Sequence, residues 1–360
     1  METIEKIRFF NLRNLSDQIL LFSPKMNCIF GENGNGKTNI LEGIYLTINR
    51  KSFRKKAAFQ QILSVDCGKP EIITNLTTNN KSNKIEYYLT YWDNQSFTCL
   101  KNNEEKVKKP KLDCVFISPF DSFSFHNESS FRRNLIDTFI SRMNPNYKKS
   151  LLAYNKLLKQ KNYLLKYNID HSQLDAIDSV LSEKIVIINI ERDNFIRNLN
   201  PCLEFIYHEI FSDEVCLSLE INTPFKSLNY NETFLKLKNN RSKDIESRVS
   251  RTGPHRDEVT LKFNGFDSVE FCSLGQQKTA YLSLLFAYIN LFGYKFRVFP
   301  IVLIDDVSGE LDSVRLSQLL KYLFKAEYQV VLTTANDDFK KKIMAFGNIN
   351  LINVKDGYFH

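Results

Sequence analysis

The chain has 360 residues, of which 43 % are apolar and 25 % are charged, and its formal net charge is +8. This length predicts about two domains, and the composition excludes a disordered chain. No apolar run approaches the roughly 20 residues that span a bilayer, and the first residues do not match a secretory signal. We therefore expect a globular, cytoplasmic protein with no membrane partner.

The first third of the chain shows mainly strand patterns. Short strands are expected at 3–9, 19–22 and 26–30, and a helix is expected at about 40–49. Residues 71–117 carry further strand signals separated by turns that contain asparagine, which predicts an antiparallel sheet.

After Pro119 the pattern becomes helical. Apolar residues at three- and four-residue spacing predict helices at 132–141, 147–165 and 172–199, and Pro201 is expected to interrupt or end the last of them. Strands at 214–221 and 259–263 are expected to bracket a polar loop. The longest helix would measure about 40 Å at 1.5 Å per residue, which suits an arm rather than a long coiled coil.

A phosphate-binding loop is expected between the strand at 26–30 and the helix that follows. The sequence Gly31-Glu32-Asn33-Gly34-Asn35-Gly36-Lys37-Thr38 fits the pattern G-x-x-x-x-G-K-[ST]. The glycines let backbone N–H groups converge on an anion, and the helix adds the positive end of its dipole. Lys37 would reach the β- and γ-phosphates of ATP, and Thr38 would be a ligand of Mg²⁺. The alternative is an ordinary glycine-rich turn.

An acidic pair follows an apolar strand at Pro300–Asp306. In a P-loop enzyme such a strand brings a carboxylate to the metal, so Asp305 is the expected Mg²⁺ residue. Asp306 would orient or deprotonate the attacking water.

A second anion-binding turn is expected at Cys272–Lys278, directly before a helix at 279–291. Ser273, Gly275 and Gln276 would offer a hydroxyl, an open backbone N–H and a helix N-terminus to a phosphate. Since the chain already has one complete phosphate loop, this turn would contact the γ-phosphate held by another copy and make ATP the link of a dimer. Alternatively, Ser273 only caps the helix.

Taken together, the loop, the Ser-x-Gly-Gln turn, the Asp-Asp strand and Gly309–Asp312 resemble an ATP-binding-cassette (ABC) ATPase head. Other stretches resemble the RecF family of bacterial recombination mediators, an SMC-type branch of these heads. They are Leu12–Asn14, Ser52–Arg54, Ile117–Pro119, Arg132–Asp137, Asn155–Asn162, Thr252–Asp257 and Leu303–Val307. The resemblance extends from about residue 4 to about residue 336.

The resemblance implies an α/β fold, in which residues 1–120 and 250–360 form a discontinuous ABC-type P-loop head and residues 121–249 form an inserted helical arm. It implies weak, Mg²⁺-dependent ATP hydrolysis, with Asp312 in a loop at the dimer interface. It further implies an ATP-driven homodimer that clamps gapped DNA or junctions of single and double strands. With RecO and RecR, such a dimer would promote recombinase loading, and hydrolysis would release it.

The DNA contacts are expected in two basic clusters. Arg54, Lys55 and Lys56 form one, and Lys148, Lys149 and Lys156 on a lysine-rich helix form the other. They would bind phosphates without reading bases, although solvated surface residues fit the same pattern. Along the sequence, no alternation of aromatic and basic residues marks a platform for single strands.

Two other ATPase classes stay open: a transporter subunit and an ATP-sensing scaffold. The long insertion between Lys37 and Asp305 and the lack of a clear glutamine loop disfavour a transporter. The scaffold is favoured by Asp306, because transporters carry glutamate there and a shorter acid would slow hydrolysis.

Overall fold

The computed structural model describes residues 2–54, 57–64, 68–80, 82, 84–118, 120–211, 214–306, 309 and 311–360. They form two compact units. The first, which we call the head, comprises Met1–Ser122, Glu209–Ser212 and Tyr281–His360. The second, which we call the arm, comprises Phe123–His208 and Asp213–Ala280. Among the described residues, no helix is both long and apolar enough to cross a membrane.

The head contains a six-stranded sheet that is mostly parallel. Its strands, in order, are β15 (Tyr358–Phe359), β14 (Asn350–Lys355), β3 (Met26–Phe30), β13 (Val330–Thr334), β12 (Ile301–Ile304) and β8 (Cys114–Ile117). From β14 to β8 all neighbours are parallel, and β15 is antiparallel to β14. Since parallel strands end at the same edge of a sheet, the segments that follow β3 and β12 come together there.

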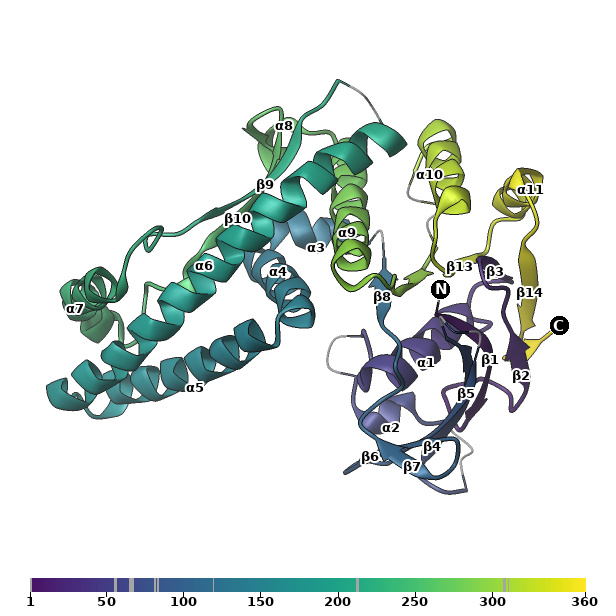
Figure 1. Ribbon diagram of the computed structural model, residues 1–360, viewed down its shortest axis with the longest axis horizontal. Coiled ribbons are helices and arrows are strands. Elements are labelled where there is room, and N and C mark those ends of the chain that lie inside the picture. The colour runs from purple at the N-terminus through teal and green to yellow at the C-terminus, as the bar shows by residue number, and fades with distance from the viewer. Residues whose placement is uncertain are drawn as a thin grey trace. The chain divides into compact units, whose positions relative to one another are not determined.

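A second sheet in the head is antiparallel. Its strands, in order, are β2 (Ile19–Leu21), β1 (Thr3–Phe10), β4 (Ile72–Asn79), β5 (Ile85–Trp92), β6 (Phe97–Lys101) and β7 (Glu105–Val107). Helix α1 (Lys37–Asn49) packs against both sheets and shares one hydrophobic core with them (Figure 1). Its apolar face, which includes Ile40, Ile44 and Ile48, is completely buried. The antiparallel sheet expected at 71–117 is confirmed as far as β7. Strand β8 instead joins the parallel sheet, because its apolar residues pair with β12.

The head contains further helices, and some helices are divided between the two units. They include α2 (Phe59–Ile62), α10 (Ser313–Lys325), α11 (Asp337–Phe346) and the later part of α9 (Leu274–Phe296), which begins in the arm.

The arm combines long helices with a small antiparallel sheet (Figure 1). The helices are α3 (Asp121–Asn127), α4 (Ser129–Met143), α5 (Pro145–Tyr167), α6 (His171–Ile210), α7 (Tyr230–Ser247), the 3-10 turn η1 (Pro254–Arg256) and α8 (Ser268–Phe271). The sheet has the order β11 (Phe266–Asp267), β10 (Glu258–Phe263) and β9 (Leu217–Asn222). Asn144 caps α5 by accepting hydrogen bonds from the backbone N–H groups of Asn146 and Tyr147.

Pro201 does not end the third helix of the arm, so this expectation is wrong. Helix α6 has 40 residues and contains Pro201, which gives it a length of about 60 Å. Pro201 and Arg197 are both exposed, so water can satisfy the carbonyl oxygen that the proline leaves without a donor. On the buried side, Leu199 and Leu203 are completely covered and hold the helix on either side of the proline.

The polar loop expected between the last two strands of the arm contains helix α7. Asn229 begins this helix with a capping box, in which its side chain accepts from the Glu232 N–H and Glu232 accepts from the Asn229 N–H. The buried face of α7 is largely polar and includes Arg241 and Asp244. A search for apolar periodicity therefore misses this helix.

The two units divide the chain at different places from those expected. The arm continues to Ala280 rather than ending at 249. The reason is the pairing of β9 with β10, which joins the segment after α7 to the arm. The arm is consequently a mixed helical and β unit.

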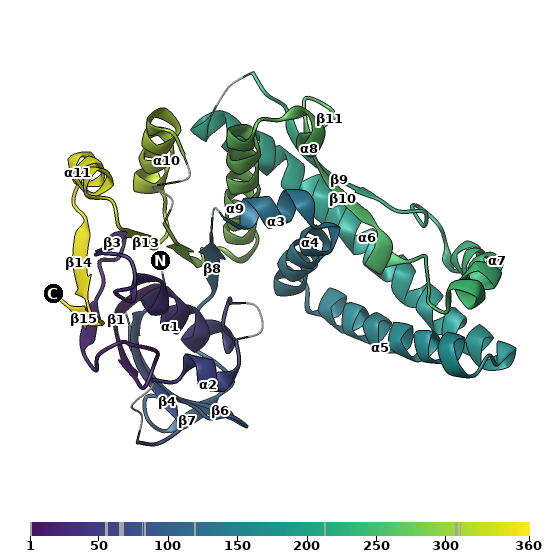
Figure 2. The same cartoon turned by 180° about the vertical axis from the view of Figure 1, so that it is seen from behind.

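Buried charges hold α5, α6 and α7 together, as the view in Figure 2 helps to follow. The Lys161 Nζ lies 3.0 Å from Asp178 Oδ1 and 2.9 Å from Asp244 Oδ2, and all three side chains are inaccessible to solvent. Arg241 Nη2 donates to Asp178 Oδ2 over 2.8 Å. Because each charge here is costly to bury without its partners, the cluster specifies how the three helices pack.

His255 has a structural place in the arm. Its Nδ1 lies 2.6 Å from the Tyr154 hydroxyl, and its Nε2 lies 3.1 Å from the carbonyl oxygen of Ser250. Burial lowers the pKa of His255, and Arg256 and Arg133 act in the same direction, so the ring is neutral at pH 7. A Cβ atom at Gly253 would lie 2.4 Å from the Tyr154 hydroxyl oxygen, which explains the glycine in this turn.

We expect Asp244→Ala to loosen the arm, because it removes one of the two carboxylates that compensate Lys161. Breaking a buried pair of this kind costs about 3 kcal/mol. Hydrogen–deuterium exchange should show faster exchange in α5, α6 and α7. Glu246→Ala, at an exposed position of the same helix, is the control and should leave exchange unchanged. Equal protection in both variants would contradict the assigned role of the cluster.

Candidate nucleotide-binding site

The loop between β3 and α1 has the backbone of a phosphate-binding cradle. Gly34 and Gly36 have φ angles of 88° and 103°, which are favourable only for glycine. Gly36 is the N-cap of α1, and it offers no side chain to the first N–H groups of the helix. These donors and the positive end of the helix dipole are thus directed at the loop, an arrangement that suits an anion.

Lys37 lies within this loop. Its Nζ donates to the carbonyl oxygens of Gly31 (2.7 Å) and Glu32 (2.9 Å). Burial lowers the pKa of Lys37, while the nearby carboxylates of Asp306 and Asp305 act against this. The ammonium group is therefore held beside the glycines, where a phosphate would be bound.

Thr38 and Asp305 meet at the carboxyl edge of the parallel sheet. The Thr38 hydroxyl is 3.0 Å from both carboxylate oxygens of Asp305, and the Thr333 hydroxyl donates to Asp305 Oδ1 over 2.7 Å. Burial raises the pKa of Asp305, although the hydrogen bonds from Thr333 and Thr38 oppose the shift. A hydroxyl and a carboxylate this close are the hard oxygen ligands that Mg²⁺ takes when phosphate oxygens and water complete its shell. The residues present therefore fit a magnesium–nucleotide site.

Asp306 follows with an unusual backbone conformation. Its φ angle is 41°, which is uncommon for a residue with a Cβ. Its N–H donates to the Thr333 hydroxyl over 3.0 Å. Burial lowers the pKa of Lys37, and the carboxylates of Asp306 and Asp305 both lie close enough to oppose that shift.

A buried carboxylate, Glu42, organises the surroundings of the cradle, although no motif in the sequence marks it. Glu42 is inaccessible to solvent and accepts two hydrogen bonds from Arg13, over 2.9 and 3.0 Å. It also accepts from the Ser52 hydroxyl, and Arg54 Nε lies 3.5 Å from it. Phe53 is anchored by stacking on Phe116, with ring centroids 3.6 Å apart. Two of the stretches that carry the family resemblance thus converge on α1.

The segment that contains Asn14 packs against the cradle. Asn14 Oδ1 accepts from the Asn39 side chain over 2.7 Å, and a Cβ atom at Gly36 would lie 2.9 Å from that oxygen. Asn35 is held by β14, because its side chain donates to the Val354 carbonyl over 3.2 Å. The φ angle of Gly36 favours glycine, and the Asn14 side chain packs closely against it.

Arg54 is placed beside the cradle. Its Nη2 donates to the Asn39 side chain over 2.7 Å, and together with Glu42 this directs the guanidinium toward α1. Lys55 and Lys56 lie outside the described residues. Lys148, Lys149 and Lys156 are exposed on α5, so the second basic cluster lies on the surface of the arm.

Ser273, Gly275 and Gln276 are at the start of α9, in the arm unit. The Ser273 N–H donates to Gln276 Oε1 over 2.9 Å, and the Gln276 N–H donates to the Ser273 hydroxyl over 3.3 Å. This is the helix-capping alternative, and Ser273 is also exposed. A contact with the nucleotide of another copy stays a prediction.

Asp312 is the N-cap of α10. Its Oδ1 accepts from the N–H groups of Val314 (3.0 Å) and Arg315 (2.9 Å). These hydrogen bonds, the one from Arg315 above all, lower the pKa of Asp312. Its place at a dimer interface also stays a prediction.

Known proteins match nearly the whole chain. Residues 3–355 match the family model described as the RecF/RecN/SMC N terminal domain. The DNA replication and repair protein RecF of Clostridioides difficile is 30 % identical, over 98 % of this chain and 97 % of the relative. The protein of the same name from Clostridium beijerinckii is also 30 % identical, over 97 % of this chain and 98 % of the relative.

Solved structures agree with these matches. A structure described as the recombination mediator protein RecF-ATP in the RecFOR pathway has a TM-score of 0.81 and 25 % identity, and covers 100 % of this chain and 99 % of its own. A second RecF structure from the same pathway has a TM-score of 0.84 and 26 % identity. It covers 99 % of this chain and 97 % of its own. An Smc head domain from Pyrococcus yayanosii shares the fold, with a TM-score of 0.59 and 12 % identity. It covers 100 % of this chain and 96 % of its own. The chain therefore belongs to the RecF family and has the ABC-type head that this family shares with the SMC proteins.

Proposed function

We propose that this protein is an ATP-dependent DNA-binding protein of recombinational repair and replication-fork maintenance. ATP would drive two copies together on gapped DNA or on junctions of single and double strands. The dimer would promote recombinase loading with RecO and RecR, and slow hydrolysis would release it. The observation that carries the proposal is that Lys37 lies in the glycine loop while the Thr38 hydroxyl meets the Asp305 carboxylate at the end of the neighbouring strand, in a chain whose relatives are named for DNA replication and repair.

Each residue of the site has a defined part in this proposal. The loop N–H groups and Lys37 bind the phosphates of ATP, and Thr38 and Asp305 hold Mg²⁺. When bound, Mg²⁺ neutralises charge on the β- and γ-phosphates. Asp306 orients the attacking water or accepts its proton.

The dimer completes the site in this proposal. Ser273, Gly275 and Gln276 of one copy contact the γ-phosphate that the other copy holds, and Asp312 lies in the loop that crosses the interface. The exposure of Ser273 at the start of α9 supports this assignment.

The lysines of α5 bind the DNA backbone in this proposal. Every charged side chain of α5 is a lysine, so no acid on this helix offsets their attraction for phosphate. Such contacts position the duplex without reading its sequence.

We expect Lys37→Ala to abolish ATP-driven dimerisation, because it removes the ammonium group that reaches the phosphates. The loss of one charge-assisted hydrogen bond of this kind weakens nucleotide binding by about tenfold or more. Sedimentation velocity with and without ATP measures the dimer. Lys342→Ala, which changes an exposed lysine of α11, should behave like the unaltered protein. An ATP-dependent dimer of the Lys37 variant would contradict the assignment.

We expect Asp306→Asn to retain ATP binding and dimerisation but to hydrolyse ATP about a hundredfold more slowly, since an amide cannot accept the proton. Steady-state phosphate release measures the rate. Asp338→Asn, at an exposed position of α11, serves as the control. An unchanged rate would show that the base lies elsewhere.

We expect reversal of Lys148, Lys149 and Lys156 to glutamate to weaken DNA binding and to flatten its dependence on salt. Each lost phosphate contact lowers the slope of log K against log salt by about 0.9. Fluorescence anisotropy with a gapped duplex and a plain duplex, with and without ATP, measures both quantities. The matched control reverses the exposed lysines Lys321, Lys325 and Lys342 of the head.

If the control changes the salt slope as much as the α5 variant does, net charge rather than the arm surface governs binding. If the unaltered protein binds ATP but no DNA at any salt concentration, the proposed function is wrong and an ATP-sensing scaffold replaces it.

A further inference from the structure

Two tyrosines lie exposed near the turn between α5 and α6, in a region of residues 159–177 that we call the arm tip. Tyr163 and Tyr167 are 63 % and 64 % exposed, and their ring centroids are 5.1 Å apart. The Lys166 ammonium lies 4.9 Å from the centre of the Tyr167 ring. The fold does not need these rings, because the small core of the tip consists of Leu164, Leu165 and Leu174 with their apolar neighbours.

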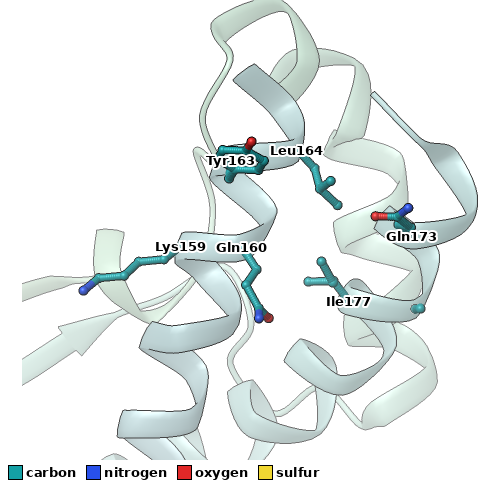
Figure 3. Close-up of a pocket in the computed structure, with 7 residues that line it drawn as sticks. Lys159, Gln160, Tyr163, Leu164, Gln173 and Ile177 are labelled. Atoms are coloured by element: carbon teal, nitrogen blue, oxygen red, sulfur yellow. The ribbon is translucent and has the colours of Figure 1, made fainter. Parts of the chain in front are cut away.

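A hollow of about 550 Å³ lies beside Tyr163, between α5 and α6. Figure 3 shows Leu164 and Ile177 on the facing sides of the two helices, with Gln173 beside them. Gln160 also lines the hollow. The hollow thus combines an apolar floor with two amide groups, which can donate and accept hydrogen bonds at once.

The exposed charge on the α5 side of the tip is positive. Lys159 and Lys166 are exposed, and α5 contains no acidic residue. Asp175 of α6 is paired, because it lies 2.6 Å from Arg241. Asp170, just before α6, is turned to the helix start, where it accepts from the N–H groups of Ser172 and Gln173. The partner that this surface fits is therefore an anion with flat apolar parts.

We propose that the arm tip binds unpaired nucleotides of a DNA single strand. Successive bases stack on Tyr163 and Tyr167, Lys159 and Lys166 contact the phosphates, and one base enters the hollow, where Gln160 and Gln173 hydrogen-bond its edge. This rests on the proposed function and specifies which part of a gapped DNA the arm recognises. An acidic peptide fits less well, because the tip alternates exposed rings with lysines instead of offering a continuous apolar strip.

This arrangement distinguishes single strands from duplexes. The bases of a duplex are stacked on each other and have no free face, whereas unpaired bases offer theirs to the tyrosines. Stacking on aromatic side chains tolerates any sequence, since every base has a π-face. The arm would thereby add a preference for gaps to the phosphate contacts of α5.

The test uses the full chain with ATP and measures the affinity for oligo(dT), gapped duplex and plain duplex by fluorescence anisotropy. Tyr163→Ala combined with Tyr167→Ala should weaken oligo(dT) binding about tenfold or more, and should reduce the affinity for gapped duplex to that for plain duplex. Tyr163→Phe combined with Tyr167→Phe keeps the rings and should bind as the unaltered protein does. Leu152→Ala removes a side chain of the same helix that is 62 % exposed but has no ring, and it should have no effect.

Cross-linking gives an independent readout. Ultraviolet irradiation of a complex with an oligonucleotide that contains 5-iododeoxyuridine should join the base to Tyr163 or Tyr167, which mass spectrometry can locate. Equal oligo(dT) binding by the alanine variant, with no cross-link at the tip, would overturn this inference and leave the tip to a protein partner. Failure of the unaltered protein to bind any DNA would instead overturn the proposed function itself.

Discussion

The head depends on the register of three neighbouring parallel strands. β13 pairs with β3 on one side and with β12 on the other, so that all three end at one edge. This register places Thr333 beside Asp305 and allows Thr38, in the first turn of α1, to reach the same carboxylate. A shift of one residue would turn these side chains to the other face of the sheet. Residues distant in the sequence therefore form one site because the apolar runs that carry them pair in a single way.

Glu42 couples this site to the rest of the head. It is buried in α1 beyond the cradle, and it compensates Arg13 while contacting Ser52 and Arg54. Removing Glu42 would leave the Arg13 guanidinium partly buried without its acid, which is more costly than losing the pair altogether. The stretches that looked like separate family motifs are consequently parts of one electrostatic unit around α1.

The sequence predicts those features whose signal is local. The phosphate loop, the acidic strand and most of the strands could be read directly, because spacing and apolar runs determine them. The polar face of α7 and the continuation of α6 through Pro201 depend on partners elsewhere in the chain, such as the compensation of Arg241 by Asp178. The pairing of Tyr163 with Tyr167 cannot be recognised from the sequence, for a different reason. Tyr163 and Tyr167 are four residues apart, and only the helix brings them onto the same face.

The arm uses charge in two opposite ways. Inside it, Lys161 is surrounded by the carboxylates of Asp178 and Asp244, and Arg192 is held by Asp137 and Asp257. These charges are paired, and all of them are buried except Asp137, which is partly exposed, so they define packing. On its surface, α5 displays lysines that no acid of the same helix offsets. Acidic residues would make the surface of α5 equally soluble. Because α5 has lysines but no acidic residue, its composition suits the anionic partner of the proposed function. The paired interior keeps the helices in place, while in the proposed function the exposed lysines of α5 supply the affinity for DNA.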